Sequence, residues 1–159
     1  MKVFIAMGSD SDWPVMKQAA AVLKEFGVEF EARVVSAHRT PEDLGPFAKE
    51  CEQSEATCII AGAGGAAHLP GMLASYTYLP VIGVPVQLKT LDGMDSLLSI
   101  VQMPKGVPVA TVAINNSTNA ALLALKMIGI TNTDIRQKLI DFKQKQKDES
   151  RAKTKNLIL

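Results

Sequence analysis

The sequence has almost no net charge and no long apolar run. Its 17 basic and 16 acidic side chains leave a formal net charge of +1, whereas general nucleic-acid binding requires a strongly basic surface. Glycine and proline interrupt the longest uncharged stretches, so none reaches the ~18 consecutive apolar residues of a membrane-spanning helix. We therefore expect neither nucleic acid nor a membrane as a partner.

Cysteine and histidine are also scarce, with two residues of each. The apolar run at residues 3–7 ends in polar residues, which makes it too short for a secretory signal peptide. We therefore expect a cytoplasmic protein in which Cys51 and Cys58 are reduced thiols. A metal site would need these cysteines, His38 and His68 to converge from a helix, a strand and two loops, so we expect no metal.

Charge is distributed unevenly along the 159 residues. Between positions 56 and 114 only Lys89, Asp92, Asp95 and Lys105 are charged, which predicts a region covered on both faces or by partner subunits. Residues 133–159, in contrast, hold eight basic and four acidic side chains. We expect one domain over residues 1–159, with a C-terminal helix and a basic tail from about residue 133.

Short apolar runs alternate with helical patterns along the chain. Five strands are predicted at residues 3–7, 29–35, 57–61, 81–86 and 109–113. Helices are predicted at 13–27 with Asp12 as an acidic cap, from Thr40 as a cap, and at 69–76, 94–101, 119–128 and 133–147. This pattern indicates a three-layer α/β/α, flavodoxin-like fold around a central parallel sheet of about five strands. Ligands of such sheets bind outside the carboxyl ends of the strands, so the loops after the first three strands should carry the chemistry.

Two of these loops have polar residues suited to an anionic ligand. Residues 8–12 read Gly-Ser-Asp-Ser-Asp, a pattern that suits phosphate at a helix N-terminus, although it also suits a plain helix cap. Residues 36–41 read Ser-Ala-His-Arg-Thr-Pro. Arg39 suits a phosphate or carboxylate, and His38 can carry a proton in either direction near neutral pH.

The third loop, residues 62–71, contains the pattern G-x-G-x-x-A found in dinucleotide sites. It follows the third strand rather than the first, and no acidic residue lies between Glu55 and Asp92 to bind a ribose. We therefore expect its backbone amides to approach a small anionic ligand. His68 is either a second ligand contact or a loop histidine satisfied by its neighbours.

Other proteins with this type of sheet fit less well. A phosphoacceptor receiver domain needs an aspartate at the end of the third strand, where this chain has Ala61. A flavin site needs flanking aromatic rings, for which Trp13, Tyr76 and Tyr78 are available, although the two tyrosines are more typical of packing or interfaces. A nucleotide- or flavin-binding module remains the non-enzymatic alternative, against which the adjacent His38 and Arg39 argue.

Five spaced segments together resemble the class I PurE proteins: residues 8–12, 36–41, 61–71, 83–86 and 99–104. The resemblance implies a mutase that converts N5-carboxyaminoimidazole ribonucleotide to 4-carboxy-5-aminoimidazole ribonucleotide in purine biosynthesis. It also implies a homo-octamer with active sites near subunit contacts, and no metal or organic cofactor. Class II relatives, which carboxylate aminoimidazole ribonucleotide directly, are the enzymatic alternative, but their glycine loop differs from this one.

The resemblance also implies the roles of individual residues toward the ribonucleotide substrate. His38 is the general acid and base. Asp12 binds the ribose hydroxyls, and Ala63 and Gly64, with His68, accommodate the migrating carboxylate. The contacts to phosphate and carboxylate come from Ser9, Ser11, Ser36 and Arg39.

Overall fold

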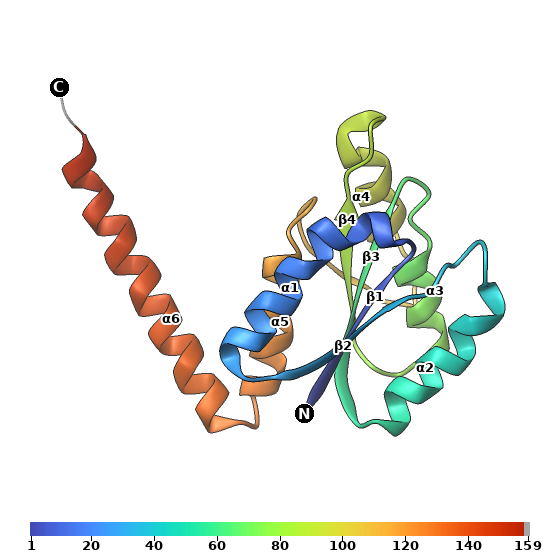
Figure 1. The fold of residues 1–159 in the computed structure, drawn as a ribbon, viewed down its shortest axis with the longest axis horizontal. Coiled ribbons are helices and arrows are strands. Elements are labelled where there is room, and N and C mark those ends of the chain that lie inside the picture. The colour runs from blue at the N-terminus through green and yellow to red at the C-terminus, as the bar shows by residue number, and fades with distance from the viewer. Residues whose placement is uncertain (158–159) are drawn as a thin grey trace. The chain divides into compact units, whose positions relative to one another are not determined.

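Five parallel strands form the centre of the fold, in the order β2-β1-β3-β4-β5 (Figure 1). The computed structural model describes residues 1–157, so the last two residues of the expected basic tail lie outside the described part. The order confirms the flavodoxin-like expectation, because the chain reverses direction across the sheet between β1 and β3. The strands are β1 (Lys2–Met7), β2 (Glu29–Val34), β3 (Ala56–Gly64), β4 (Val81–Val86) and β5 (Ala110–Thr111).

The first three strands finish close to one another in register. Met7, at the end of β1, lies opposite both Val34 of β2 and Gly62 of β3. The loops that follow these strands therefore leave the sheet at the same edge. This register brings the predicted site loops together although they are up to 60 residues apart in sequence.

Helices cover both faces of the sheet. On one face lie α2 (Leu44–Gln53), α3 (Leu69–Tyr76) and α4 (Met94–Val101), packed around a buried core that includes Phe4 and Ile59. On the other face lies α1 (Trp13–Phe26), which ends where Gly27 adopts a positive φ of 76°. The helix α5 (Ser117–Gly129) begins beside α1, where the Ser117 hydroxyl donates to the Val15 carbonyl over 2.6 Å.

The third strand continues three residues beyond its predicted end, because it includes Gly62, Ala63 and Gly64, and it starts one residue earlier, at Ala56. The sequence expectation treated these glycines as the start of a loop. Their small size serves close packing instead: a Cβ on Gly62 would lie 2.3 Å from the Met16 sulfur. The site residues Ala63 and Gly64 are therefore held on a strand rather than on a loop.

The fifth strand is shorter than predicted, at two residues instead of five. Its neighbour β4 contains Pro85, which has no N–H to donate to β5. The Asn115 amide still donates to the Pro85 carbonyl over 2.8 Å, so the chain follows β4 without a regular ladder.

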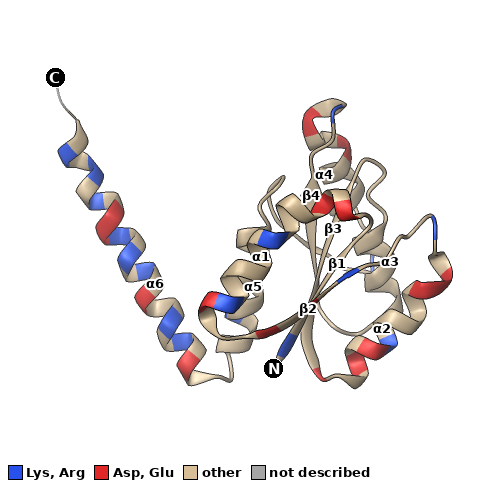
Figure 2. Ribbon diagram, viewed as in Figure 1, with Lys and Arg blue, Asp and Glu red and all other residues tan. Residues whose placement is uncertain are grey.

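The chain divides into two compact units, Met1–Ala124 and the part from Leu125 onward. The second unit contains α6 (Thr133–Ala152), which continues five residues beyond the predicted end. Side-chain pairs one turn apart support the extension, such as Lys145 with Glu149 and Gln144 with Asp148. Figure 2 shows basic residues along its length. Within residues 1–157 no helix is long and apolar enough to cross a membrane.

Short 3-10 turns lead into or follow four of the helices. They are η1 (Asp10–Asp12) before α1, η2 (Pro41–Asp43) before α2, η3 (Leu91–Gly93) before α4 and η4 (Lys153–Asn156) after α6. Thr40 precedes η2 but does not cap it, contrary to the prediction. Its hydroxyl donates to the Ser36 carbonyl over 3.3 Å instead, because the chain turns back on itself between these two residues.

Candidate active site

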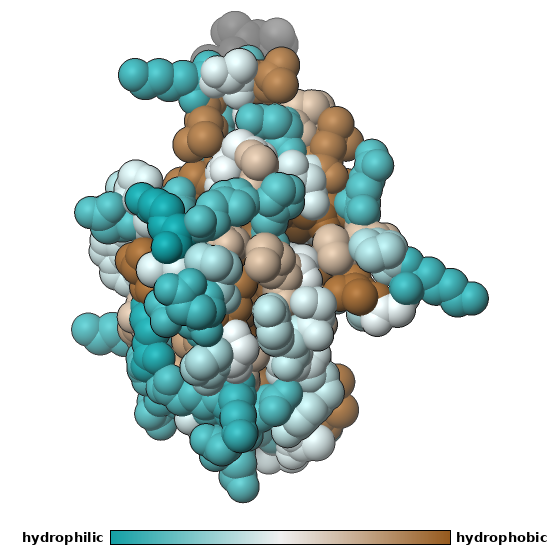
Figure 3. All heavy atoms as spheres, turned by 90° about the vertical axis from the view of Figure 1, so that its right-hand side faces the viewer, coloured by the Kyte–Doolittle hydropathy of each residue, from teal (hydrophilic) through white to brown (hydrophobic). Residues whose placement is uncertain are grey.

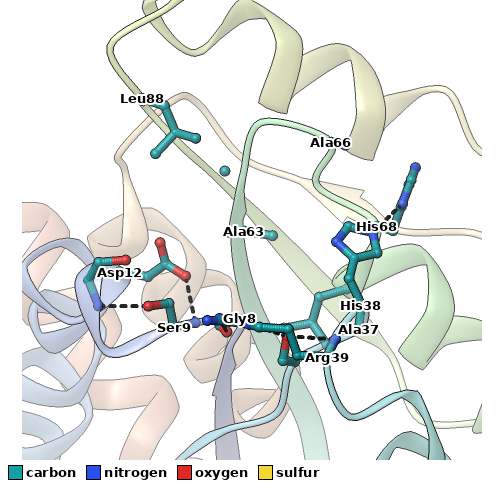
Figure 4. A pocket seen from close by; sticks show the side chains of 14 residues that line it. Gly8, Ser9, Asp12, Ala37, His38, Arg39, Ala63, Ala66, His68 and Leu88 are labelled. Atoms are coloured by element: carbon teal, nitrogen blue, oxygen red, sulfur yellow. Dashed lines mark hydrogen bonds between the residues drawn. The ribbon is translucent and has the colours of Figure 1, made fainter.

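A cavity of about 380 Å³ lies at the carboxyl end of the strands (Figure 4). All nine site residues expected from the sequence line it, although they come from the end of β3 and from the segments that follow three different strands. We call Ser9, Ser11, Asp12, Ser36 and Arg39 the serine side, and His38, Ala63, Gly64 and His68 the histidine side. The remaining lining residues are Gly8, Ala37, Ala66, Leu69 and Leu88.

Short-range hydrogen bonds shape the first loop of the serine side. The Ser9 hydroxyl accepts from the Ser11 amide at 3.2 Å, and the Asp12 carboxylate accepts from the Ser9 amide at 3.1 Å. This reciprocal arrangement is a capping box. The prediction that the Asp12 side chain caps α1 is therefore wrong. Its carboxylate instead accepts from the Ser9 amide in the turn before the helix.

Asp12 is the only charged residue among the buried side chains of the described chain, with 6% of its surface exposed. Burial raises the pKa of its carboxyl group, and donation from the Ser9 and Gly8 amides offsets only part of that rise. Arg39 also acts against the rise through its charge. A buried carboxylate that keeps a lone pair toward the cavity is suited to accept hydrogen bonds from hydroxyl groups of a ligand.

Arg39 links the two loops of the serine side. Its Nη2 donates to the Gly8 carbonyl over 2.7 Å, and its Nε donates to the Ser36 hydroxyl oxygen over 3.1 Å. The Arg39 backbone amide donates to the same hydroxyl oxygen. The guanidinium group remains exposed at the rim of the cavity, where an anionic group can reach it.

Two imidazole rings meet on the histidine side. His38 Nε2 lies 2.7 Å from His68 Nδ1, and the rings are nearly perpendicular at 88°. One of these two nitrogens donates and the other accepts, so the rings share one proton between them. The sequence left open whether His68 contacts a ligand or is a loop histidine satisfied by its neighbours. In the structure His68 is hydrogen-bonded to the other histidine of the site. The nitrogens outside this bond, Nδ1 of His38 and Nε2 of His68, remain able to exchange a proton with a ligand.

The two small residues of the histidine side lie next to a leucine. Ala63 and Gly64 carry little or no side chain where β3 ends, which leaves space for a ligand. Leu88, from the segment after β4, approaches Gly64 so closely that a Cβ there would lie 2.9 Å from its Cγ. Sequence reasoning missed Leu88 because only the loops after the first three strands were considered. The same rule applied to the fourth strand would have included it.

The arrangement combines a proton-transferring pair with a polar anion-binding side. The histidines supply general acid–base chemistry, while Arg39 and the serine hydroxyls match a phosphate or carboxylate. Within residues 1–157 no group of three or more His, Cys, Asp or Glu side chains is placed to hold a metal ion. Burial raises the pKa of each of the two free cysteines to about 12. A thiol of that pKa is a poor nucleophile at neutral pH.

Comparisons with known proteins identify the family of this chain. Residues 2–149 match the family model described as AIR carboxylase. The chain is 58% identical over 156 residues to N5-carboxyaminoimidazole ribonucleotide mutase of Thermotoga maritima, covering 98% of this chain and 91% of that protein. It is 59% identical over 155 residues to phosphoribosylaminoimidazole carboxylase of Saccharomyces cerevisiae, covering 98% of this chain but only 27% of that longer protein.

The fold matches a solved structure over the same extent. The crystal structure of Treponema denticola PurE superimposes with a TM-score of 0.90 at 28% sequence identity, covering 99% of each chain. The sheet order and helix placement described above are therefore shared with a protein of known structure.

Proposed function

Because this chain belongs to the AIR carboxylase family, we propose that it is an N5-carboxyaminoimidazole ribonucleotide mutase of purine biosynthesis. The observation that carries the proposal is the hydrogen-bonded pair His38–His68, which faces a cavity bordered by Arg39 and Asp12. Relatives of nearly the same length that carry this name support the choice of reaction.

The two sides of the cavity contact different parts of the substrate. Arg39 and the hydroxyls of Ser9, Ser11 and Ser36 bind the phosphate and stabilise the carboxylate, because they offer charge and hydrogen-bond donors. Asp12 accepts from the ribose hydroxyls. On the histidine side, Ala63 and Gly64 leave space for the migrating carboxylate, and His68 helps hold it.

His38 supplies and removes the proton that the transfer requires. The bond between the exocyclic nitrogen and the carboxylate carbon breaks, its electron pair stays on the nitrogen, and His38 protonates that nitrogen. Ring carbon C4 then attacks the carbon dioxide retained in the cavity and forms the new carbon–carbon bond. The deprotonated His38 removes the proton from C4, which restores aromaticity and returns the histidine to its starting state.

Direct carboxylation of aminoimidazole ribonucleotide is the second candidate. It is favoured by the 59% identity to the yeast carboxylase, which is as high as the 57–59% identity to the mutases. Both reactions end in the same C4-carboxylated product and differ in where the carbon dioxide enters. A nucleotide- or flavin-binding module without catalytic activity is the third candidate. A measurement of substrate turnover distinguishes it from the two enzymes.

The experiment supplies wild-type protein with either freshly made N5-carboxyaminoimidazole ribonucleotide or aminoimidazole ribonucleotide plus bicarbonate. Product from the first substrate only, lost in His38→Asn, is expected. Efficient product formation from the second substrate would show that the protein is a carboxylase instead. No product from either substrate would favour the non-enzymatic binding module. A yellow colour of the purified protein would then indicate that the module binds a flavin.

The proposal extends to assembly, cofactors and location: a cytoplasmic homo-octamer that needs no cofactor. Apolar side chains at Leu91, Met94, Leu98 and Val101 are each about half exposed or more. The last three lie at helical spacing on one face of α4, and Leu91 lies in the η3 turn that precedes it. Figure 3 shows hydrophobic patches between polar residues on one face of the molecule. Such a surface is typical of a subunit contact. Light scattering at micromolar concentration tests this part, and a stable monomer would contradict it.

A further inference from the structure

The position of His68 depends on a short, tightly turned segment. Gly65 follows β3 with φ at +69°, a conformation that other residues rarely adopt. The Ala67 amide then donates to the Gly65 carbonyl, and the His68 amide donates to the Ala66 carbonyl, each over 2.8 Å. These two consecutive turns leave little freedom between Gly65 and His68. Where Gly65 is held therefore determines where the His68 ring emerges.

A single buried hydroxyl holds Gly65. The Ser96 Oγ accepts from the Gly65 amide over 2.8 Å and donates to the Val86 carbonyl over 2.7 Å. Ser96 lies in α4, with no exposed surface. It thus joins the end of β4 to the turn that follows β3, across 31 positions of sequence.

The neighbouring serine of α4 plays a different part. The Ser99 Oγ lies 2.7 Å from the Asp95 carbonyl of its own helix and 3.3 Å from the Gly65 carbonyl. A hydroxyl has one hydrogen to donate, and the shorter distance places it within the helix. Ser96 is therefore the side chain on α4 with two short bonds outside its own helix.

A serine at a fully buried helix position needs an explanation. Serine is not a strong helix former, and a buried hydroxyl requires partners. Ser96 satisfies two backbone groups at once, the Gly65 amide and the Val86 carbonyl. Its removal would leave both groups without their present partner, so the turn would shift to find another.

We propose that Ser96 is a positioning residue that fixes the glycine turn and, through it, the His38–His68 pair. The inference rests on the proposed function, because it concerns the geometry in which that pair transfers a proton. The serine side is held by other elements, through the contacts of Asp12 and Arg39. Loss of the Ser96 hydroxyl should therefore lower kcat and leave KM for the nucleotide nearly unchanged.

The test compares Ser96→Ala with Ser117→Ala. Ser117 is a matched control because it is equally buried and its hydroxyl also donates to a backbone carbonyl, that of Val15 in α1, which is not part of the glycine turn. We expect both variants to lose thermal stability. Only Ser96→Ala should lose kcat, by about 10- to 100-fold, because small displacements of reacting groups have effects of that order. It should also release more aminoimidazole ribonucleotide and free carbon dioxide for each product formed, because the displaced His68 no longer helps hold the migrating carboxylate.

A second pair of variants separates the hydroxyl from packing. Threonine and valine have nearly the same shape, so Ser96→Thr and Ser96→Val disturb the buried site equally, and only threonine keeps the hydroxyl. A higher kcat for Ser96→Thr is expected. Equal kcat values for these two variants, or for Ser96→Ala and Ser117→Ala, would overturn the inference while leaving the mutase intact. A wild-type protein that does not convert N5-carboxyaminoimidazole ribonucleotide would instead overturn the proposed function, and the inference with it.

Discussion

The serine side and the histidine side of the cavity are built in different ways. On the serine side, the bonds that shape the first loop join residues two or three positions apart, as in the capping box of Ser9 and Asp12. On the histidine side, His38 and His68 are 30 positions apart, and the link from Gly65 to Ser96 spans 31. Local bonds thus shape the first loop of the serine side, whereas contacts between distant segments bring the two histidines together, as they also bring Arg39 to Gly8.

Replacing the proton carrier breaks the histidine side most completely. His38→Asn should lower turnover by about 10²- to 10⁴-fold, the usual contribution of a general acid or base. His38 is exposed at the cavity, so folding and nucleotide binding should remain. The measurement combines single-turnover product formation with the melting temperature and nucleotide binding. Turnover close to wild type would refute the assigned role.

Replacing Arg39, the cation of the serine side, should affect substrate binding and leave proton transfer unchanged. Arg39→Ala removes the guanidinium group that faces the cavity, and hydrogen bonds to charged groups contribute about 1.5–3 kcal/mol. We expect KM to rise about 10- to 100-fold while kcat changes little. Steady-state kinetics give both values. A fall in kcat at unchanged KM would mean that the two sides do not divide the work as proposed.

A pair of glycine substitutions compares how tightly the two sides are packed. In Gly64→Ala the new Cβ would lie 2.9 Å from the Leu88 side chain and 3.0 Å from the Val86 carbonyl oxygen. Overpacking of this kind lowers the free energy of unfolding by about 1–3 kcal/mol. In Gly8→Ala the nearest atom is the Asp12 Oδ2 at 3.8 Å, so a change within about 0.5 kcal/mol is expected. Denaturant titrations of both variants measure the free energy of unfolding. Equal losses in the two variants would contradict the expected difference in packing.

The smallest expected effect is a pH trend at Asp12. Its pKa is raised in the folded protein, so the folded state binds this proton more tightly than the unfolded state does. The resulting stability is complete below the ordinary carboxyl pKa of about 3.9 and is lost as the pH rises through the raised value. Relative to Asp12→Asn, the wild-type protein should therefore become less stable across that interval.

Urea titrations between pH 3.5 and pH 7 measure this difference. Asp10→Asn, in the same turn but exposed, controls for the change in net charge. A wild-type stability that rises with pH relative to Asp12→Asn would contradict the assigned effect of burial.

The sequence predicted what depends on short segments and on the order of strands. The strands β1 and β4 and the helices α3 and α4 were placed within one residue of their observed bounds, because glycine, proline and apolar runs delimit them locally. All nine expected residues line one cavity, because loops after parallel strands meet at one edge of the sheet. Their individual roles stay predictions.

What the sequence did not predict depends on contacts between distant segments. The bond between His38 and His68 arises only when β2 and β3 pair with β1 on either side. The approach of Leu88 to Gly64 and the bond from Gly65 to Ser96 arise only when β3, β4 and α4 pack together. The Thr40 cap failed for a local reason, since the Ser36 carbonyl, four residues earlier, accepts from its hydroxyl. The end of β3 was misplaced because its glycines pack against Met16 and Leu88 rather than form a loop.

The most direct test of the proposed reaction follows the carboxylate itself. N5-carboxyaminoimidazole ribonucleotide labelled with ¹³C in its carboxylate is converted by the wild-type protein in buffer rich in unlabelled carbon dioxide and bicarbonate. Mass spectrometry then reports the label in the C4-carboxylated product. The mutase account predicts that the product keeps the label, because carbon dioxide stays in the cavity between the two sides. Product with the isotopic composition of the buffer would contradict it.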